Sequence, residues 1–273
     1  MLLEAVRQLL KNAGEIVIPK EAKKQMEQKI LSEQSFKTKN IKIENKKVTI
    51  YPSAASATPV IYLNTFAEEE GDCVHRTLCD MSCPDFTLVV ISGLEWNHDM
   101  VLWDIPPVSK NDAPYTKGAD EYLQLMIEQI IPNTEKYMQG SIAWRGLAGY
   151  SLAGLFAVYS MYQTTLFSRI ASMSGSLWFP DFKEYVFSNE PMQKPDHLFF
   201  SLGDRECKTK NPYLKTVQSH TEAIEAFYRG QGIDTILCMN AGGHFKDTAQ
   251  RTASGIRWLL SKPAKSVETT KDL

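Results

Sequence analysis

A serine between small residues is the first feature of this sequence that could support covalent chemistry. Gly149-x-Ser151-x-Ala153 lies between a short apolar segment, Ile142 to Gly149, and a helical one, Leu152 to Tyr162. Small residues two positions before and after the serine let a strand and a helix approach closely around a sharp turn that exposes the hydroxyl. The start of the following helix favours negative charge on a substrate oxygen. This pattern is typical of a serine nucleophile, although a small-residue helix start with Ser151 as N-cap has the same sequence.

Two further polar groups follow later apolar segments. Leu198 to Leu202 runs into a loop that carries Asp204 and Glu206, and a Gly-Gly-His sequence ending at His244 follows the next strand-like segment. Carboxyl ends of parallel strands meet at one edge of a sheet, where active sites form. We therefore expect Ser151 to attack a carbonyl, His244 to carry its proton, and one of the two carboxylates to orient the imidazole. Taken alone, either later element is better explained as solvated loop residues.

The elements that must position these groups alternate between strand-like and helical segments, which predicts an α/β fold. Near-continuous apolar runs are typical of a mostly parallel central sheet, covered by helices on both faces. Alternating apolar residues in 36–51 predict an N-terminal antiparallel hairpin. The other expected strands are 59–66, 86–94, 142–149, 170–173, 198–202 and 235–239, and the expected helices are 121–138, 152–162, 216–229 and 249–260. Pro132 should kink or divide the first of these helices, and 179–195 is expected to be a loop or cap-like insertion facing the site.

The chain ends carry no sign of a membrane segment. Apolar residues at helical spacing within 1–11 predict an N-terminal helix. Charged residues interrupt it, unlike the core of a signal peptide, and no apolar run approaches the ~20 residues of a membrane helix. We expect a cytoplasmic protein that does not bind membranes. We also expect a single domain over 1–273, with a helix-and-hairpin extension at 1–58, a catalytic core at 59–262 and a polar tail at 263–273.

Composition narrows the class of ligand. The 273 residues are 43% hydrophobic and 23% charged, and 30 Lys and Arg against 32 Asp and Glu give a net charge of −2. This composition excludes a disordered chain and argues against nucleic acid as the main ligand, because there is no basic excess. Cys73, Cys79 and Cys83 cluster near His75, but without the spacing of a tight zinc knuckle. We expect no metal and no cofactor, and the oligomeric state is left open.

In combination, these motifs resemble the esterase family of α/β-hydrolases that includes esterase D, feruloyl esterases and the enterobactin and salmochelin siderophore esterases. The resemblance runs from about Pro59 to Leu260 and is nearest to the siderophore esterases. Ala153 stands where the family usually has glycine. The matching segments are Ile91-Ser-Gly-Leu94, the Ser151 elbow continued by Gly154-Leu-Phe156, Ser174-Gly-Ser-Leu-Trp178, Gly203-x-x-Glu206 and Gly242-Gly-His244.

The resemblance implies an α/β-hydrolase fold and a serine carboxylic-ester hydrolase with a Ser-His-acid triad and an acyl-enzyme intermediate. The implied substrate is a small-molecule ester, such as a catecholate trilactone or another aryl ester. Glu206 is favoured over Asp204, because relatives usually carry the acid three residues after the strand-end glycine. For the oxyanion hole we expect the N–H groups of Leu152 and Leu94. An acyltransferase with the same triad and a catalytically silent binding protein of this fold are the alternatives.

Aromatic and basic residues near the expected site suggest how a substrate binds. Trp96, Trp103 and Trp178 lie on expected loops near the carboxyl edge of the sheet, where they would stack on an aryl group or serve only in packing. Arg205 is a further candidate for substrate binding. With Lys208, Lys210 and Lys246 it is close in sequence to the proposed acid and histidine. These residues are expected either to attract an anionic substrate or to form a solvated loop face.

Overall fold

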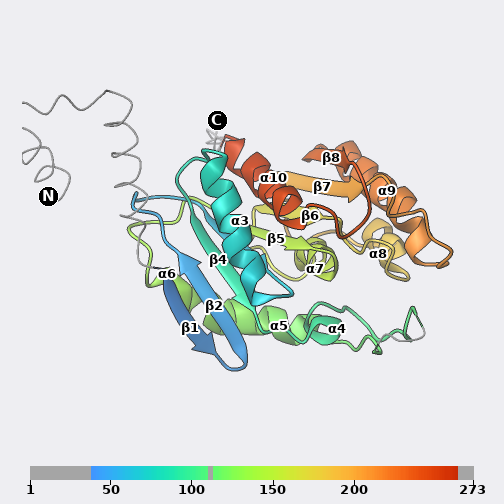
Figure 1. Cartoon of the computed structure of the whole chain (residues 1–273), viewed down its shortest axis with the longest axis horizontal. Helices are drawn as coiled ribbons and strands as arrows, with labels where there is room; N and C mark the ends of the chain where they lie inside the picture. The colour runs from blue at the N-terminus through green and yellow to red at the C-terminus, as the bar shows by residue number, and fades with distance from the viewer. Residues whose placement is uncertain (1–37, 110–112, 264–273) are drawn as a thin grey trace, which may run out of the picture. The chain divides into compact units, whose positions relative to one another are not determined.

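The structure is a computed structural model that describes residues 38–109 and 113–263. These residues build an eight-stranded sheet with helices on both faces (Figure 1). The expected N-terminal helix lies outside the described residues, as does the tail beyond Pro263, and the single domain with an extension stays a prediction. None of the helices in the described ranges is both long and apolar enough to span a bilayer.

The sheet is mostly parallel, with an antiparallel hairpin at one edge. The strands are β1 (Lys39–Ile43), β2 (Lys46–Tyr51), β3 (Val60–Asn64), β4 (Thr87–Ser92), β5 (Arg145–Tyr150), β6 (Arg169–Met173), β7 (His197–Gly203) and β8 (Asp234–Asn240). Their order is β1-β2-β4-β3-β5-β6-β7-β8. β1 pairs antiparallel with β2 and β2 with β4, whereas the pairings from β4 through β8 are parallel. The predicted hairpin and mostly parallel sheet are confirmed.

The inner strands are apolar because helices cover them from both sides. Every residue of β3, β4 and β6 is buried, as expected of near-continuous apolar runs. β3 pairs with β5 so that Asn64 is opposite Gly149, and β4 lies on the other side of β3. The loop that leaves β3 is therefore the neighbour of the loop that leaves β5.

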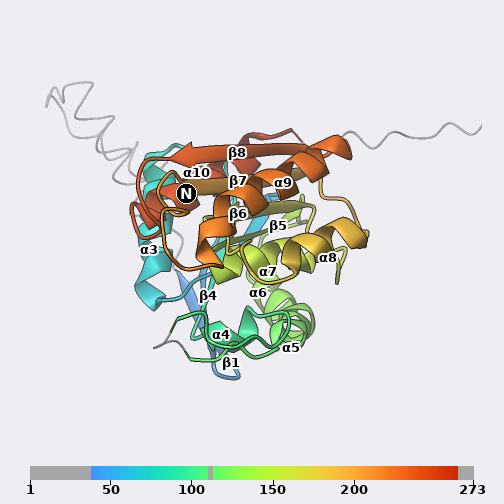
Figure 2. The ribbon, with the colours of Figure 1, turned by 90° about the vertical axis from the view of Figure 1, so that its right-hand side faces the viewer.

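Two helix layers enclose the sheet. α3 (Glu68–Asp80) and α10 (Thr248–Ser261) pack against each other on one face, where Val74 and Ile256 share an apolar core with Leu63 of β3 (Figure 1). A second core on the opposite face joins the sheet to a further set of helices (Figure 2). The helices of this face are α5 (Ala119–Leu125), α6 (Ile131–Glu135), α7 (Leu152–Ser160), α8 (Phe182–Ser188) and α9 (Val217–Gly230).

The helix expected over 121–138 is divided, as Pro132 predicted. α5 ends at Leu125, a π-helical turn covers Met126–Ile130, and α6 begins at Ile131. Proline has no N–H to donate and crowds the preceding turn. A shift to the wider i→i+5 pattern just before it is a common way for a helix to absorb such an interruption.

The prediction that 179–195 is a loop or cap-like insertion facing the site is wrong as to the loop. α8 lies within it and packs against α9, with Phe182 and Val186 buried. Two turns are too short for a helical period to stand out in the sequence. α3 was also not predicted, although three consecutive glutamates, Glu68 to Glu70, favour a helix start at that point.

Candidate active site

Ser151 occupies a sharp turn between β5 and α7. Its φ of 58° and ψ of −123° form a backbone conformation that a non-glycine residue keeps only where the surrounding structure imposes it. Gly149 makes the turn sterically possible, because a Cβ on it would lie 2.4 Å from the carbonyl carbon of Ala153. The helix therefore begins in direct contact with the strand, and Ala153 packs against Gly149.

His244 reaches Ser151 from the loop between β8 and α10. Its Nε2 atom lies 3.1 Å from Ser151 Oγ, and its Nδ1 atom lies 2.7 Å from Glu206 Oε2. With Nδ1 protonated and donating to the carboxylate, Nε2 is free to accept the serine proton. The His244 side chain is 27% exposed and that of Glu206 only 4%, so solvent reaches the imidazole but scarcely reaches the acid.

Glu206 uses its two carboxylate oxygens differently. Oε2 accepts from His244, whereas Oε1 accepts from the Gly203 N–H at 2.6 Å and the Ser174 hydroxyl at 2.8 Å. Arg251 Nη1 donates to Oε1 as well, at 3.2 Å. Burial alone would raise the pKa of Glu206, but the hydrogen bond and charge of His244 and the bonds to Oε1 together lower it. The carboxylate is therefore ionised at neutral pH and held in one orientation.

Asp204, the other candidate acid, does not meet the histidine. Its Oδ1 accepts the Gly242 N–H at 2.7 Å, and its own N–H donates to the Asn240 carbonyl at 2.8 Å. It thereby ties the loop after β7 to the loop that carries His244. Of the two carboxylates, the structure brings Glu206 to the imidazole.

A second serine, which sequence reasoning did not select, lies beside the first. Ser176 Oγ is 3.3 Å from Ser151 Oγ, and the Ser176 N–H donates to the Ser151 carbonyl at 3.0 Å. The residue comes from the bend after β6, where Ser174 has a φ of 43°. The Ser-Gly-Ser sequence is the signal that could have identified it, since a glycine between two small polar residues marks a tight turn.

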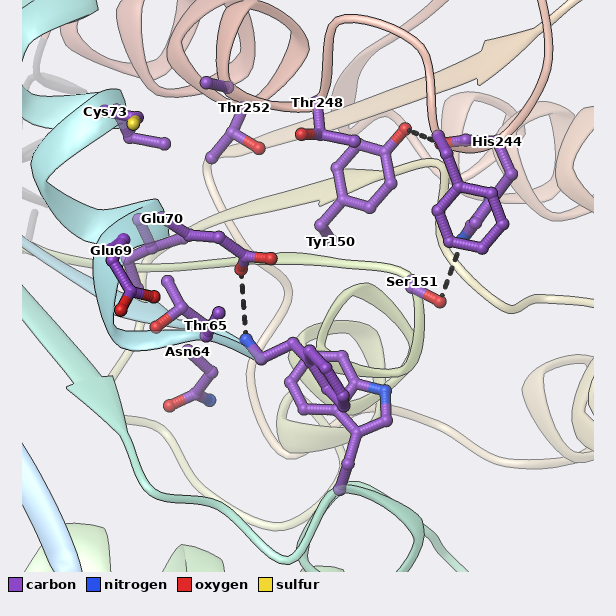
Figure 3. A pocket seen from close by; sticks show the side chains of 17 residues that line it. Asn64, Thr65, Glu69, Glu70, Cys73, Tyr150, Ser151, His244, Thr248 and Thr252 are labelled. Carbon is purple, nitrogen blue, oxygen red and sulfur yellow. Dashed lines mark hydrogen bonds between the residues drawn. The ribbon is translucent and has the colours of Figure 1, made fainter. Parts of the chain in front are cut away.

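Two cavities open on Ser151 and His244. The larger encloses about 470 Å³ between α3 and the start of α10 (Figure 3), and the smaller encloses about 220 Å³. Phe245 is 90% exposed and belongs to the lining of both. Because the two cavities share the same serine and histidine, an ester bound there can place its two sides in different cavities.

The larger cavity carries acidic groups. Glu69 and Glu70 of α3 line it, whereas no lysine or arginine of the described chain does so. Glu70 Oε2 accepts the Phe66 N–H at 3.1 Å (Figure 3), and burial raises the pKa of this glutamate. The electrostatic potential of the cavity therefore disfavours an anionic group.

The basic residues that the sequence places near the site do not line it. Arg205, Lys208, Lys210 and Lys246 are exposed, and neither cavity includes them. The Arg205 N–H donates to the Gly242 carbonyl at 3.1 Å. Substrate binding by its side chain stays a prediction, beside the alternative of a solvated loop face.

The three predicted tryptophans have different surroundings. Trp96, on the short helix α4 (Trp96–Asp99), lines the larger cavity and packs edge-on against Phe66. Trp178 lines the smaller cavity and is 8% exposed. Trp103 lines neither: its indole N–H donates to the Pro180 carbonyl at 3.2 Å. Of the two roles expected of Trp103, this hydrogen bond favours packing against the segment before α8.

The two expected main-chain donors also differ. Leu152 begins α7 next to Ser151, so its N–H has no partner within the helix. Leu94 follows β4, packs against the apolar core and lines neither cavity. The expectation for Leu94 is corrected, because the sheet order puts β3 rather than β4 beside β5. Phe66, in the loop after β3, lines the larger cavity instead.

Two cysteines of the cluster lie on α3 and the third follows that helix. Cys73, Cys79 and Cys83 are free thiols, and Cys79 Sγ lies 3.8 Å from His75 Nε2. Within 38–109 and 113–263, no group of three or more His, Cys, Asp or Glu side chains is arranged to hold a metal ion.

The chain matches a known family over most of its length. The family described as "Putative esterase" covers residues 45–220. The uncharacterized protein YbbA of Bacillus subtilis (strain 168) is 20% identical over 237 residues, which is 81% of this chain and 95% of that protein.

Solved structures share the fold at low sequence identity. An IroE-like serine hydrolase from Shewanella oneidensis is similar with a TM-score of 0.68 and 20% identity, over 82% of this chain and 79% of that one. The siderophore hydrolase EstB from Aspergillus nidulans is similar with a TM-score of 0.59 and 16% identity, over 81% of this chain and 94% of that one. The α/β-hydrolase fold is confirmed. With a match that spans more than half of its residues, the chain belongs to this esterase family and is an esterase.

Proposed function

We propose that the chain hydrolyses carboxylic esters through an acyl-enzyme on Ser151. The observation that carries the proposal is the chain of hydrogen bonds from Ser151 through His244 to Glu206, at the junction of two cavities. Ser151 Oγ attacks the ester carbonyl while His244 Nε2 takes its proton and passes it to the leaving alcohol. Water then enters, and the same imidazole activates it to release the acid. Glu206 keeps the tautomer and stabilises the imidazolium.

The oxyanion hole in this proposal uses two main-chain N–H groups. Leu152 supplies the first from the start of α7, where the helix also favours negative charge. Phe66 supplies the second, in place of Leu94, because its loop follows the strand next to β5. The Phe66 N–H donates to the Glu70 carboxylate, so that carboxylate has to turn away as the oxyanion forms.

The lining of the cavities favours an uncharged or cationic aryl ester. Phe66, Trp96 and Phe245 offer aromatic surface in the larger cavity, and Trp178 does so in the smaller. The two glutamates of the larger cavity repel a polyanion. A siderophore hydrolase is among the similar structures, which supports a siderophore ester as the substrate class. The catecholate trilactone expected from the sequence fits this lining better as the uncharged free ligand than as its anionic ferric complex.

A fluorophosphonate probe tests the nucleophile. The wild-type protein should be labelled on Ser151, and Ser151→Ala should not be labelled. Ser176→Ala is the matched control, because it removes the hydroxyl 3.3 Å away and should leave the labelled residue unchanged. Labelling that survives in Ser151→Ala and disappears in Ser176→Ala would contradict the proposal.

A cytoplasmic location belongs to the same proposal. All five cysteines lie in the described residues and are free thiols, which suits a reducing compartment. Fractionation of the native source, with the esterase activity followed by the fluorophosphonate probe, tests it. Activity in the culture medium or the membrane fraction would contradict it.

A further inference from the structure

A buried arginine outside both cavities contacts the acid of the proposed triad. Arg251, in the first turn of α10, is 3% exposed and does not line either cavity. Its Nη1 atom lies 3.2 Å from Glu206 Oε1 and 3.3 Å from Ser174 Oγ. Nη2 donates to the Ala241 carbonyl at 3.3 Å. One guanidinium thus joins α10 to the loops after β6, β7 and β8.

The same guanidinium reaches the strand that carries the nucleophile. Arg251 Nη1 lies 3.2 Å from the hydroxyl oxygen of Tyr150, the residue before Ser151. The Tyr150 hydroxyl donates in turn to the His244 carbonyl at 2.6 Å. Arginine and tyrosine therefore connect the backbone positions of nucleophile, base and acid, although neither takes part in the Ser151–His244–Glu206 hydrogen bonds.

The charges around the acid show what the arginine does electrostatically. The charged and titratable groups around the acid include Tyr150 from β5 and Arg251 from α10. The loop after β7 adds Glu206 with the exposed Asp204 and Arg205, and the loop after β8 adds His244 with the exposed Lys246 and Asp247. Of these, Arg251 is the cation that is buried against Glu206. A buried guanidinium stabilises the ionised form of the carboxylate beside it.

We propose that Arg251 is a positioning residue for the reaction. Together with Tyr150 it holds Glu206 and the His244 loop in place relative to Ser151, and its charge keeps the Glu206 carboxylate ionised as the pH falls. This inference rests on the proposed function of the triad. Because the guanidinium touches neither cavity, its effect falls on kcat and on the pH dependence of the rate rather than on KM.

Three variants separate position from charge. Arg251→Met removes both, Arg251→Lys keeps the charge but loses the planar fork, and Tyr150→Phe removes the hydroxyl that joins the fork to the His244 loop. With 4-nitrophenyl acetate, we expect Arg251→Met to lower kcat by on the order of 10²-fold with KM within about twofold. The acid limb of its pH–rate profile should move to higher pH, since loss of the neighbouring cation favours protonation of Glu206. Arg251→Lys should restore the acid limb and part of kcat, and Tyr150→Phe should lower kcat without moving the limb.

Arg169→Met is the matched control for loss of a buried arginine. Arg169 is 1% exposed and also holds the end of α10, through the Lys262 and Pro263 carbonyls at 2.9 Å, but it starts β6 at the opposite edge of the sheet. The Arg169→Met substitution should lower the melting temperature and leave the pH–rate profile unchanged. An acid limb that stays in place in Arg251→Met, or a limb that moves equally in Arg169→Met, overturns the inference. If Arg251→Met does not fold, a Lys variant with the wild-type kcat overturns it. Fluorophosphonate labelling of wild type but not of Ser151→Ala would show that the proposed function stands even when this inference fails.

Discussion

Replacing Glu206 by glutamine removes one charge and keeps the shape of the side chain. Three donors face Oε1: the Gly203 N–H, the Ser174 hydroxyl and the Arg251 guanidinium. An amide nitrogen at that position would face these three donors and find no acceptor. The glutamine oxygen must therefore take the Oε1 position, and its NH₂ group must face His244 Nδ1.

This orientation reverses the tautomer of the imidazole. His244 Nδ1 then accepts a hydrogen bond, its proton moves to Nε2, and Nε2 can no longer take the proton of Ser151. We expect kcat to fall by about 10³- to 10⁴-fold, which corresponds to about 4 to 5.5 kcal/mol of lost transition-state stabilisation. The variant also leaves the Arg251 charge buried without its anion, so the free energy of unfolding should fall by about 3 kcal/mol.

Asp204→Asn is the matched control on the same loop. Asparagine keeps an oxygen for the Gly242 N–H, so kcat should fall by less than about threefold, within the range of surface substitutions. Both variants are compared with 4-nitrophenyl acetate for kcat and KM, well below the melting temperature of each. A Glu206→Gln variant within tenfold of wild type, or an Asp204→Asn variant that loses as much as Glu206→Gln, would refute the assignment of the acid.

Three further predictions address the turn, the cavity and the pH dependence. Gly149→Ala should abolish fluorophosphonate labelling and lower the melting temperature, because the added Cβ meets the Ala153 carbonyl. Gly230→Ala is the control, since the space around its Cβ is open, and it should do neither. Equal melting temperatures of the two variants would contradict this prediction. The double variant Glu69→Gln and Glu70→Gln removes the negative charge of the larger cavity. The ratio of kcat/KM for a carboxylate-bearing aryl ester to that for its amine-bearing analogue should rise by about tenfold, which corresponds to ~1.4 kcal/mol of Coulomb energy. An unchanged ratio argues against recognition of substrate charge in this cavity. Because the pKa of Glu206 is lowered from 4.5, its contribution to stability is present above the unfolded value and is lost as pH falls through the folded one. The difference in unfolding free energy between wild type and Glu206→Gln should therefore shrink with acid in urea titrations, and a difference that does not change with pH refutes the shift.

Local patterns predicted the parts of the site that lie within a few residues of each other. The elbow was recognisable because Gly149, Ser151 and Ala153 must be close in sequence to form one turn. His244 was recognisable because a glycine pair and a strand precede it. The inner strands of the parallel sheet were visible because burial on both faces makes their sequences apolar.

What could not be predicted depends on the order of strands and on contacts between distant elements. Leu94 was expected to supply an oxyanion-hole N–H because it follows an apolar strand. Two such strands of similar composition, β3 and β4, lie in the sheet in the reverse of their chain order, so β3 is the one beside β5. Arg251 stands in a helix start with no pattern around it, and only the fold brings it to Glu206. Trp103 and Trp178 are the same residue type on neighbouring loops, and packing alone decides which one lines a cavity.

The two cavities that share Ser151 have a kinetic consequence. Under the proposed chemistry, the alcohol leaves from one cavity while the acyl group stays attached to the serine in the other. The second nucleophile then enters through the space that the alcohol has left, past the exposed Phe245. Water, the departing alcohol and any other hydroxyl compound that fits therefore compete for the same cavity in each turnover. The side chains that line this cavity set how often the ester is hydrolysed and how often it is re-formed.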